Sequence, residues 1–144
     1  MSLSIMDILS SLPYSKPFLF VDEIIEINED RVVGEYTFDE NLDFYKGHFK
    51  NNSVTPGVIL TEVMAQIGLV CLGIYLLNDN INSNTSIGLT STNIEFLKSV
   101  FPNEKVTVIS EKIYFRFGKL KCKVQMKNEK DEIVCTGEIA GMIV

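Results

Sequence analysis

The sequence predicts a single α+β domain in which an antiparallel sheet wraps around one long buried helix. Three observations lead to this fold class. The stretch from Pro56 to about Leu77 is apolar on every face, which is typical of a helix enclosed by protein. About six β-rich segments lie before and after it, separated by short turn sequences. No linker, repeat or low-complexity tract divides the 144 residues, so we expect one hydrophobic core.

The N-terminal part begins with a predicted short helix and a predicted hairpin. Ser4 can cap a helix that runs through Ser11, where a following Leu-Pro pair disfavours helical geometry. Two β-rich runs follow at residues 18–27 and 31–38. Residues 28–30 between them, Asn-Glu-Asp, have turn chemistry, so we expect an antiparallel hairpin.

The central helix is expected to begin at Pro56, because proline is favoured in the first turn of a helix. It should end near Leu77, before the sequence Asn-Asp-Asn. Four β-rich segments follow, at about 86–96, 105–117, 120–127 and 133–144. Turn sequences at 117–119 and 128–131 predict that the last three form a meander.

Composition and charge narrow the class of protein. The hydrophobic fraction of 46% and the charged fraction of 22% are those of an ordinary globular protein. The net charge of −6 argues against nonspecific binding to nucleic acid or to anionic membranes, which need extended positive surfaces. Cys71, Cys122 and Cys135 lack metal-ligand spacing, and an odd number fits a disulfide framework poorly. We therefore expect reduced core thiols and no metal site.

Neither a secretory signal nor a membrane span is expected. The first dozen residues lack a basic segment followed by a long apolar segment. The longest apolar stretch, Ile67 to Leu77, has eleven residues, and a membrane-spanning helix needs about 20. We therefore expect a cytoplasmic protein with no membrane partner.

One short segment contains the candidate catalytic groups. His48, the single histidine, stands fourteen residues before Glu62, and an imidazole beside a carboxyl group in an apolar site meets the needs of general acid/base catalysis. The apolar neighbours of Glu62 should raise its pKa by desolvation, and Gln66 lies on the same helix face. Gly57 opens the helix, where a free backbone N–H can polarise a carbonyl group that approaches closely.

Each of these residues also has a purely structural interpretation. A carboxylate near a helix N-terminus is stabilised by the helix dipole, and a glycine after a proline is a common turn sequence. The spacing of His48, Gly57 and Glu62 together favours the functional interpretation. The basic residues Arg116, Lys119, Lys121 and Lys123 cluster around one predicted hairpin, and Lys46 and Lys50 bracket the histidine. They form either a solvated face or a docking patch for an anionic carrier.

The motifs GHF, VTPGVILTE and MAQ, preceded by MDILSSLPYSKPFLFVDEI, resemble the 3-hydroxyacyl-acyl carrier protein dehydratases of the FabZ/FabA type over nearly the whole chain. The resemblance implies a hot dog fold and a homodimer, or a trimer of such dimers, in which each active site combines residues of two subunits. It implies that His48 is the catalytic histidine, Glu62 the catalytic acid, Gly57 the amide that binds the thioester carbonyl, and Gln66 the support of the acid. Glutamate at position 62 resembles the FabZ branch, since the FabA branch has aspartate.

The expected reaction is the reversible dehydration of a (3R)-hydroxyacyl thioester to the trans-2-enoyl thioester. In the family the substrate is carried on the phosphopantetheine of acyl carrier protein, and no metal or redox cofactor is required. Tyr14 replaces a common histidine, residues 51–53 replace a loop with glycine and proline, and Thr55 replaces a bulkier apolar residue. These departures leave room for a fatty acid, polyketide or pigment pathway. A hot dog thioesterase and a noncatalytic acyl-binding subunit are the alternatives.

Overall fold

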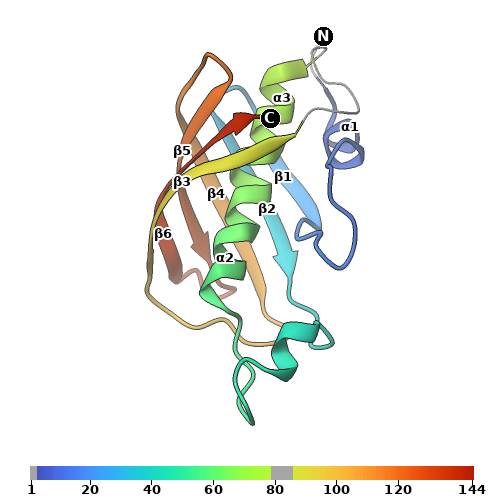
Figure 1. Cartoon of the computed structure of the whole chain (residues 1–144), viewed down its shortest axis with the longest axis vertical. Helices are drawn as coiled ribbons and strands as arrows, with labels where there is room; N and C mark the ends of the chain where they lie inside the picture. Colours follow the sequence, from blue (N-terminus) through green and yellow to red (C-terminus); the bar gives the residue numbers. More distant parts are fainter. Residues whose placement is uncertain (1–2, 79–85) are drawn as a thin grey trace.

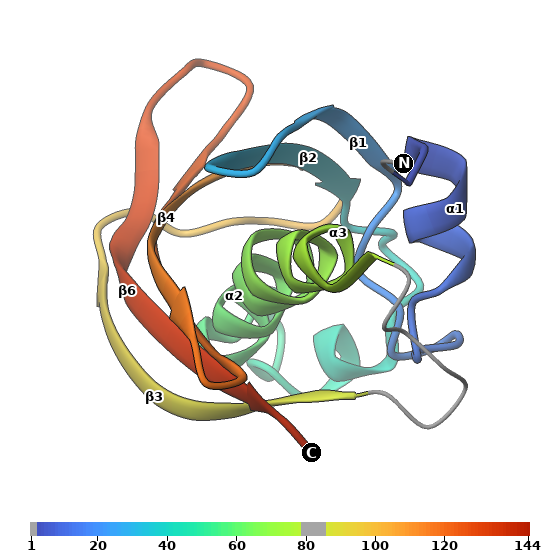
Figure 2. The ribbon, with the colours of Figure 1, turned by 90° about the horizontal axis from the view of Figure 1, so that it is seen from above.

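The computed structural model describes residues 3–78 and 86–144, and its architecture confirms the predicted α+β fold class. Six strands form one antiparallel sheet in the order β1-β2-β4-β5-β6-β3. Viewed along the central helix, the sheet curves around it (Figure 2). The strands are β1 (Glu23–Ile27), β2 (Arg31–Thr37), β3 (Ile87–Phe96), β4 (Lys105–Arg116), β5 (Lys119–Lys127) and β6 (Ile133–Ile143).

The predicted N-terminal helix is present as α1 (Ile5–Ser10). Ser4 is its N-cap: the Ser4 hydroxyl accepts a hydrogen bond from the Asp7 N–H, and the Asp7 carboxylate accepts one from the Ser4 N–H. This reciprocal capping box satisfies two N–H groups at the start of the helix. Ser11 is the C-cap, so the predicted end of the helix is confirmed.

The predicted hairpin is also present, but its first strand is shorter than predicted. β1 begins at Glu23 instead of residue 18, and β1 and β2 pair as antiparallel strands. The difference has a specific cause in the backbone hydrogen bonds of the preceding segment. The N–H of Phe20 donates to Gln66 Oε1 at 2.8 Å, and the carbonyl of Phe18 accepts from Gln66 Nε2 at 3.0 Å. Because a helix side chain satisfies these groups, the segment forms no strand ladder.

The central helix is continuous from Gly57 to Leu77 and runs along the concave face of the sheet (Figure 1). It consists of α2 (Gly57–Met64), a π-helical segment η2 (Ala65–Cys71) and α3 (Leu72–Leu77). It starts one residue later than predicted, because Pro56 has an extended conformation and is the N-cap. Its 21 residues are long and apolar enough to cross a membrane, yet 72% of the most apolar window is buried inside the protein. It is therefore a core helix.

The π-helical segment packs closely against β4, and the sequence did not predict it. A Cβ atom on Gly68 would lie 2.9 Å from the Cβ atom of Ser110, so only glycine fits at this contact. The Ser110 hydroxyl donates a hydrogen bond of 2.8 Å to the Gly68 carbonyl. A side chain of β4 thus donates a hydrogen bond to a main-chain carbonyl of the helix, in the segment where the helical hydrogen-bond pattern changes.

The predicted meander of β4, β5 and β6 is confirmed, and its buried side chains line the core. Along β5 the buried residues are Leu120, Cys122, Val124 and Met126, which alternate with more exposed residues. All three cysteines are buried free thiols, as predicted. The turn between β4 and β5 places Phe117 and Gly118 at positive φ, 53° and 75°.

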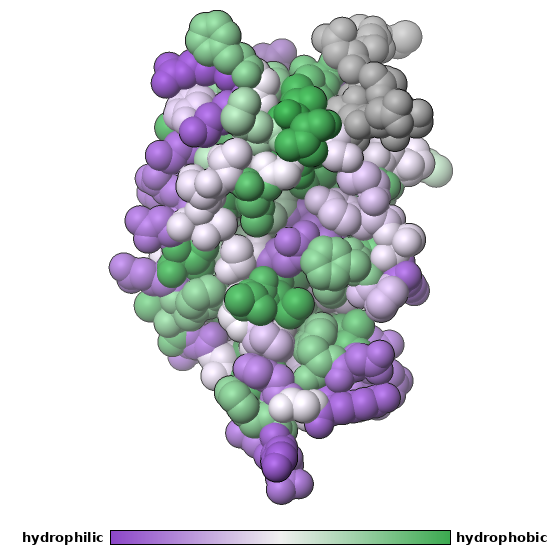
Figure 3. Space-filling view, viewed as in Figure 1, coloured by the Kyte–Doolittle hydropathy of each residue, from purple (hydrophilic) through white to green (hydrophobic). Residues whose placement is uncertain are grey.

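β3 forms one edge of the sheet and is the most exposed strand. It pairs with β6 on one side only, so its outer edge has no partner strand among residues 3–78 and 86–144. Leu89 and Phe96 on this strand are 44% and 50% exposed. Figure 3 shows the face of the molecule that β3 crosses, where apolar side chains lie between polar ones. Long unpaired edges of this kind readily pair with another chain.

Candidate active site

The loop that carries His48 lies beyond the N-terminal end of α2 (Figure 1). A short 3-10 helix, η1 (Asp43–Lys46), precedes the histidine, and residues 49–56 lead from it into α2. Glu62 lies in the second turn of α2. One end of the molecule therefore contains both candidate groups, each held by its own set of hydrogen bonds.

The imidazole of His48 is oriented by a backbone carbonyl. Its Nδ1 atom lies 2.8 Å from the carbonyl oxygen of Val54, and the Val54 N–H donates to the His48 carbonyl at 3.0 Å. Because a carbonyl oxygen only accepts, Nδ1 must carry the proton, and Nε2 of the neutral ring is left as a base. The ring also lies against Phe49, with 3.9 Å between ring centroids. Val54 gave no signal in the sequence, because it contributes only its main chain.

The carboxyl group of Glu62 is oriented by Gln66, as the sequence predicted. Gln66 Nε2 donates to Glu62 Oε2 at 3.0 Å, one helical turn away. The Gln66 amide cannot rotate, because its oxygen accepts from the Phe20 N–H and its nitrogen donates to the Phe18 carbonyl. Gln66 is fully buried, and both the oxygen and the nitrogen of its side-chain amide have hydrogen-bond partners. The segment before β1 thereby fixes which side of Gln66 faces the acid.

Burial raises the pKa of Glu62, and the hydrogen bond from Gln66 lowers it by less, so the net pKa is above its ordinary value. This agrees with the prediction from its apolar neighbours. A raised pKa favours the protonated form, which can donate a proton to a leaving group. The side chain borders a cavity of about 550 Å³ between α2 and β3, lined by Val58, Thr61, Glu62, Leu89, Thr92, Asn93, Ile94 and Phe96.

Gly57 is the first residue of α2, and its N–H has no hydrogen-bond acceptor among the residues that the structure describes. Such an N–H is free to bind an incoming oxygen atom. A Cβ atom at this position would lie 3.3 Å from the ring of Phe96, so the ring packs directly over the glycine. The sequence did not identify Phe96 as part of the site, because it comes from β3 and nothing in its local pattern distinguishes it.

Tyr14 lies near the acid. Burial raises the pKa of its phenol to about 12, and the negative charge of Glu62 adds to the effect. The Tyr14 ring is 6.4 Å from that of Phe18, the residue whose carbonyl binds Gln66. Tyr14, which stands where histidine is common in the family it resembles, therefore lies close to the carboxyl group of Glu62.

In the described part of the chain, no hydrogen bond or ion pair joins His48 and Glu62. His48 does not line the cavity that Glu62 borders. Each group is nevertheless held by its own partner, the imidazole by the Val54 carbonyl and the carboxyl group by Gln66. The single chain thus presents the two groups as separately held side chains.

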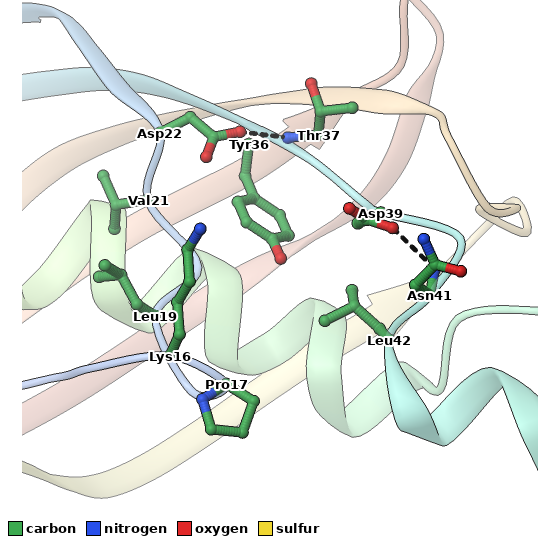
Figure 4. Close-up of a pocket in the computed structure, with 10 residues that line it drawn as sticks. All are labelled: Lys16, Pro17, Leu19, Val21, Asp22, Tyr36, Thr37, Asp39, Asn41 and Leu42. Carbon is green, nitrogen blue, oxygen red and sulfur yellow. Dashed lines mark hydrogen bonds between the residues drawn. The ribbon is translucent and has the colours of Figure 1, made fainter.

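A second cavity, of about 320 Å³, lies elsewhere. Figure 4 shows it, with the Tyr36 ring and the Asp22 and Asp39 carboxylates around it. Neither His48 nor Glu62 borders it, so it is separate from the candidate site. Among residues 3–78 and 86–144, no group of three His, Cys, Asp or Glu side chains is placed to hold a metal ion.

The candidate carrier-docking residues lie on the hairpin between β4 and β5. The guanidinium of Arg116 stacks 4.3 Å from the centroid of the Tyr114 ring, and Lys121 forms an ion pair of 3.3 Å with Glu138. Lys119 has no ion pair within the described residues. The hairpin is at the end of the molecule opposite the His48 loop (Figure 1), because β4 runs from Lys105 beside the end of β2 to Arg116.

The sequence of the chain matches the model of one protein family and resembles several known proteins over most of its length. The model of the FabA-like domain family matches residues 12–138. A 3-hydroxyacyl-[acyl-carrier-protein] dehydratase FabZ from Caldicellulosiruptor bescii is 35% identical over 135 residues, which is 92% of each chain. The protein of the same name from Clostridium perfringens is 33% identical over 141 residues, 95% of this chain and 96% of the relative.

Solved structures share the fold at low identity. A thioesterase from Haemophilus influenzae has a TM-score of 0.72 at 15% identity, covering 100% of this chain and 92% of the other. A mutant thioesterase from Pseudomonas aeruginosa has a TM-score of 0.71 at 10% identity, covering 100% and 96%. At these identities the likeness shows the arrangement of helix and sheet and carries no argument about the reaction.

Proposed function

The chain belongs to the FabA-like family, and we propose that it catalyses the reversible dehydration of a (3R)-hydroxyacyl thioester on acyl carrier protein to the trans-2-enoyl thioester. This reaction is a step of fatty acid synthesis. The observation that carries the proposal is the pair of oriented groups: an imidazole with a free Nε2 and a carboxyl group with a raised pKa. Dehydration needs such a base and such an acid.

In the proposed mechanism, Nε2 of His48 removes a proton from C2 of the substrate, and the electrons form the C2–C3 double bond. Glu62 donates its proton to the C3 hydroxyl group, which leaves as water. The N–H of Gly57 stabilises the negative charge that develops on the thioester oxygen. The proton on the imidazole then returns to the Glu62 carboxylate by way of solvent. We expect no redox cofactor, because the reaction neither oxidises nor reduces the substrate overall. We expect no metal either, because in this mechanism the Gly57 N–H stabilises the developing charge and Glu62 supplies the proton.

We propose a homodimer in which the β3 edges of two chains pair. Three features support this assembly: the exposed β3 edge, the apolar residues Leu89 and Phe96 on it, and the groove beside Glu62. A second chain laid along β3 brings its own His48 loop toward this groove and completes the acid/base pair. Whether three such dimers assemble further is decided by sedimentation velocity. We also propose that the protein is cytoplasmic.

The reaction is tested with purified protein and 3-hydroxyacyl carrier substrates, following the loss of water by mass spectrometry. We expect the enoyl thioester to accumulate to the hydration equilibrium, and the reverse reaction to occur with a crotonyl thioester. A thiol-reactive dye in the same assay separates the alternatives. Release of free thiol indicates a thioesterase, and tight binding without turnover indicates a noncatalytic subunit, so either result contradicts the proposed function.

The hairpin residues Arg116, Lys119 and Lys121 are proposed to dock the carrier protein. The protein has a net charge of −6, so an acidic carrier needs a local positive patch. The hairpin lies at the opposite end of the chain from the His48 loop, so the proposal places carrier docking on a surface apart from the acid/base groups of the same chain.

Replacing Arg116 and Lys119 together by glutamate is expected to raise KM for carrier-bound substrate about tenfold and leave KM for a crotonyl-pantetheine thioester unchanged. The measurement is initial-rate kinetics with both substrates. Lys127→Glu is the matched control, since Lys127 lies on β5 at the far end from Lys119. Equal effects of the hairpin and control variants on the carrier-bound substrate, or an equal rise with both substrates, contradict docking at the hairpin.

A further inference from the structure

The loop that holds His48 is tied to a buried tyrosine on both sides of the carbonyl that orients the imidazole. That carbonyl belongs to Val54. The residue before it, Ser53, donates its hydroxyl to the Tyr45 carbonyl at 3.0 Å. The residue after it, Thr55, has its hydroxyl 2.5 Å from the Tyr45 hydroxyl.

Both hydroxyl groups of this second contact are inside the protein. Tyr45 is 4% exposed and Thr55 is 5% exposed. The Thr55 N–H is also fixed, by a 2.8 Å hydrogen bond to the Val100 carbonyl. A buried hydroxyl without a partner is costly, so the Tyr45 and Thr55 hydroxyls hold each other in place strongly. The peptide that contains the Val54 carbonyl thus has little freedom to turn.

We propose that Tyr45 and Thr55 form a positioning pair that sets the tautomer and direction of the His48 imidazole through the Val54 carbonyl. If this carbonyl turns away, Nδ1 loses its acceptor, and the proton can move to Nε2, which is the atom that must act as the base. The pair touches neither substrate nor acid, so it acts only through His48. The kinetic part of this inference rests on the proposed function, whereas its spectroscopic part does not.

The test uses Thr55→Val, Tyr45→Phe and the double variant Tyr45→Phe/Thr55→Val. The double variant leaves no unpaired buried hydroxyl, so it should fold even where a single variant is destabilised. The chain has only one histidine, so ¹⁵N NMR of selectively labelled protein reports on His48 alone. In the wild type we expect the neutral ring to carry its proton on Nδ1. In each variant we expect a measurable share of the tautomer protonated on Nε2.

The expected kinetic result is a fall in kcat of about three- to thirtyfold with KM within about twofold of wild type. Thr55→Ser keeps the hydroxyl and should restore both kcat and the tautomer. Ser110→Ala is the matched control, because it removes another buried hydroxyl bound to a carbonyl, outside the site. It should lower Tm and leave both readouts unchanged.

A wild-type tautomer in the double variant overturns the proposal, and a lowered Tm alone then assigns Tyr45 and Thr55 a structural role. An unchanged kcat in all variants of an active wild type also overturns it. An inactive wild type contradicts the proposed function instead. In that case the NMR measurement still decides whether the pair positions the imidazole.

Discussion

His48→Ala is expected to lower kcat for hydration of a crotonyl thioester by about 10²- to 10⁴-fold, because it removes the only imidazole of the chain. KM should change little, since the ring contributes to proton transfer more than to binding. Initial rates, measured with circular dichroism of the same samples, check both the loss and the retained fold. The side chain is half-buried and makes one backbone hydrogen bond, so its removal should not unfold the protein.

The control for this variant is Asn52→Ala, an exposed position in the same loop. It should retain the wild-type kcat, which separates loss of the imidazole from disturbance of the loop. Wild-type rates in His48→Ala refute the assignment of the base. An equal loss in both variants shows instead that the measurement reports loop disruption.

Glu62→Gln is expected to reduce kcat to a similar extent, by about 10²- to 10⁴-fold. Glutamine keeps the shape of the side chain and can still accept the hydrogen bond from Gln66 Nε2, but it has no proton to transfer. Glu62→Asp is the informative companion, because it keeps the acid while drawing it back from the groove. We expect intermediate activity from aspartate. Activity in the glutamine variant near that of wild type excludes Glu62 as the acid.

The raised pKa of Glu62, caused mainly by burial, also makes a prediction about stability. A carboxyl group whose folded pKa lies above its unfolded value contributes stability at low pH, and this contribution is lost as the pH rises through the folded pKa. The free energy of unfolding of Glu62→Gln, relative to wild type, should therefore increase as the pH rises from about 4.5 upward. Urea unfolding at fixed protein concentration across this range measures it. A flat difference contradicts the raised pKa.

Mixing the two inactive variants tests whether the site is shared between chains. In a dimer of one His48→Ala chain and one Glu62→Gln chain, a composite arrangement leaves one site with both groups intact and one site with neither. Random reassociation of equal amounts should therefore restore about a quarter of the wild-type activity. No recovery, after sedimentation confirms that subunits have exchanged, places both groups of each site on a single chain.

The sequence by itself determined the central helix, the N-terminal hairpin, the C-terminal meander and the placement of Gln66 beside Glu62, whereas the pairing of β3 with β6 and of β2 with β4 was not predicted. The apolar pattern from residue 56 to 77 and the alternation along β5 are local signals, and so is the four-residue spacing that places Glu62 beside Gln66. Such features depend on backbone periodicity, which repeats within a few residues. The fold class and the hydrogen bond to the acid were therefore predictable without coordinates.

Only the tertiary structure decided how the two groups are oriented. The segment at residues 18–22 has the composition of a strand, yet its backbone bonds to Gln66, 46 residues away from Phe20. The Val54 carbonyl holds His48, and the ring of Phe96 from the sheet edge covers Gly57. These contacts join main-chain groups or residues distant in the chain, whose partners depend on the packing of helix against sheet and leave no repeating pattern in the sequence.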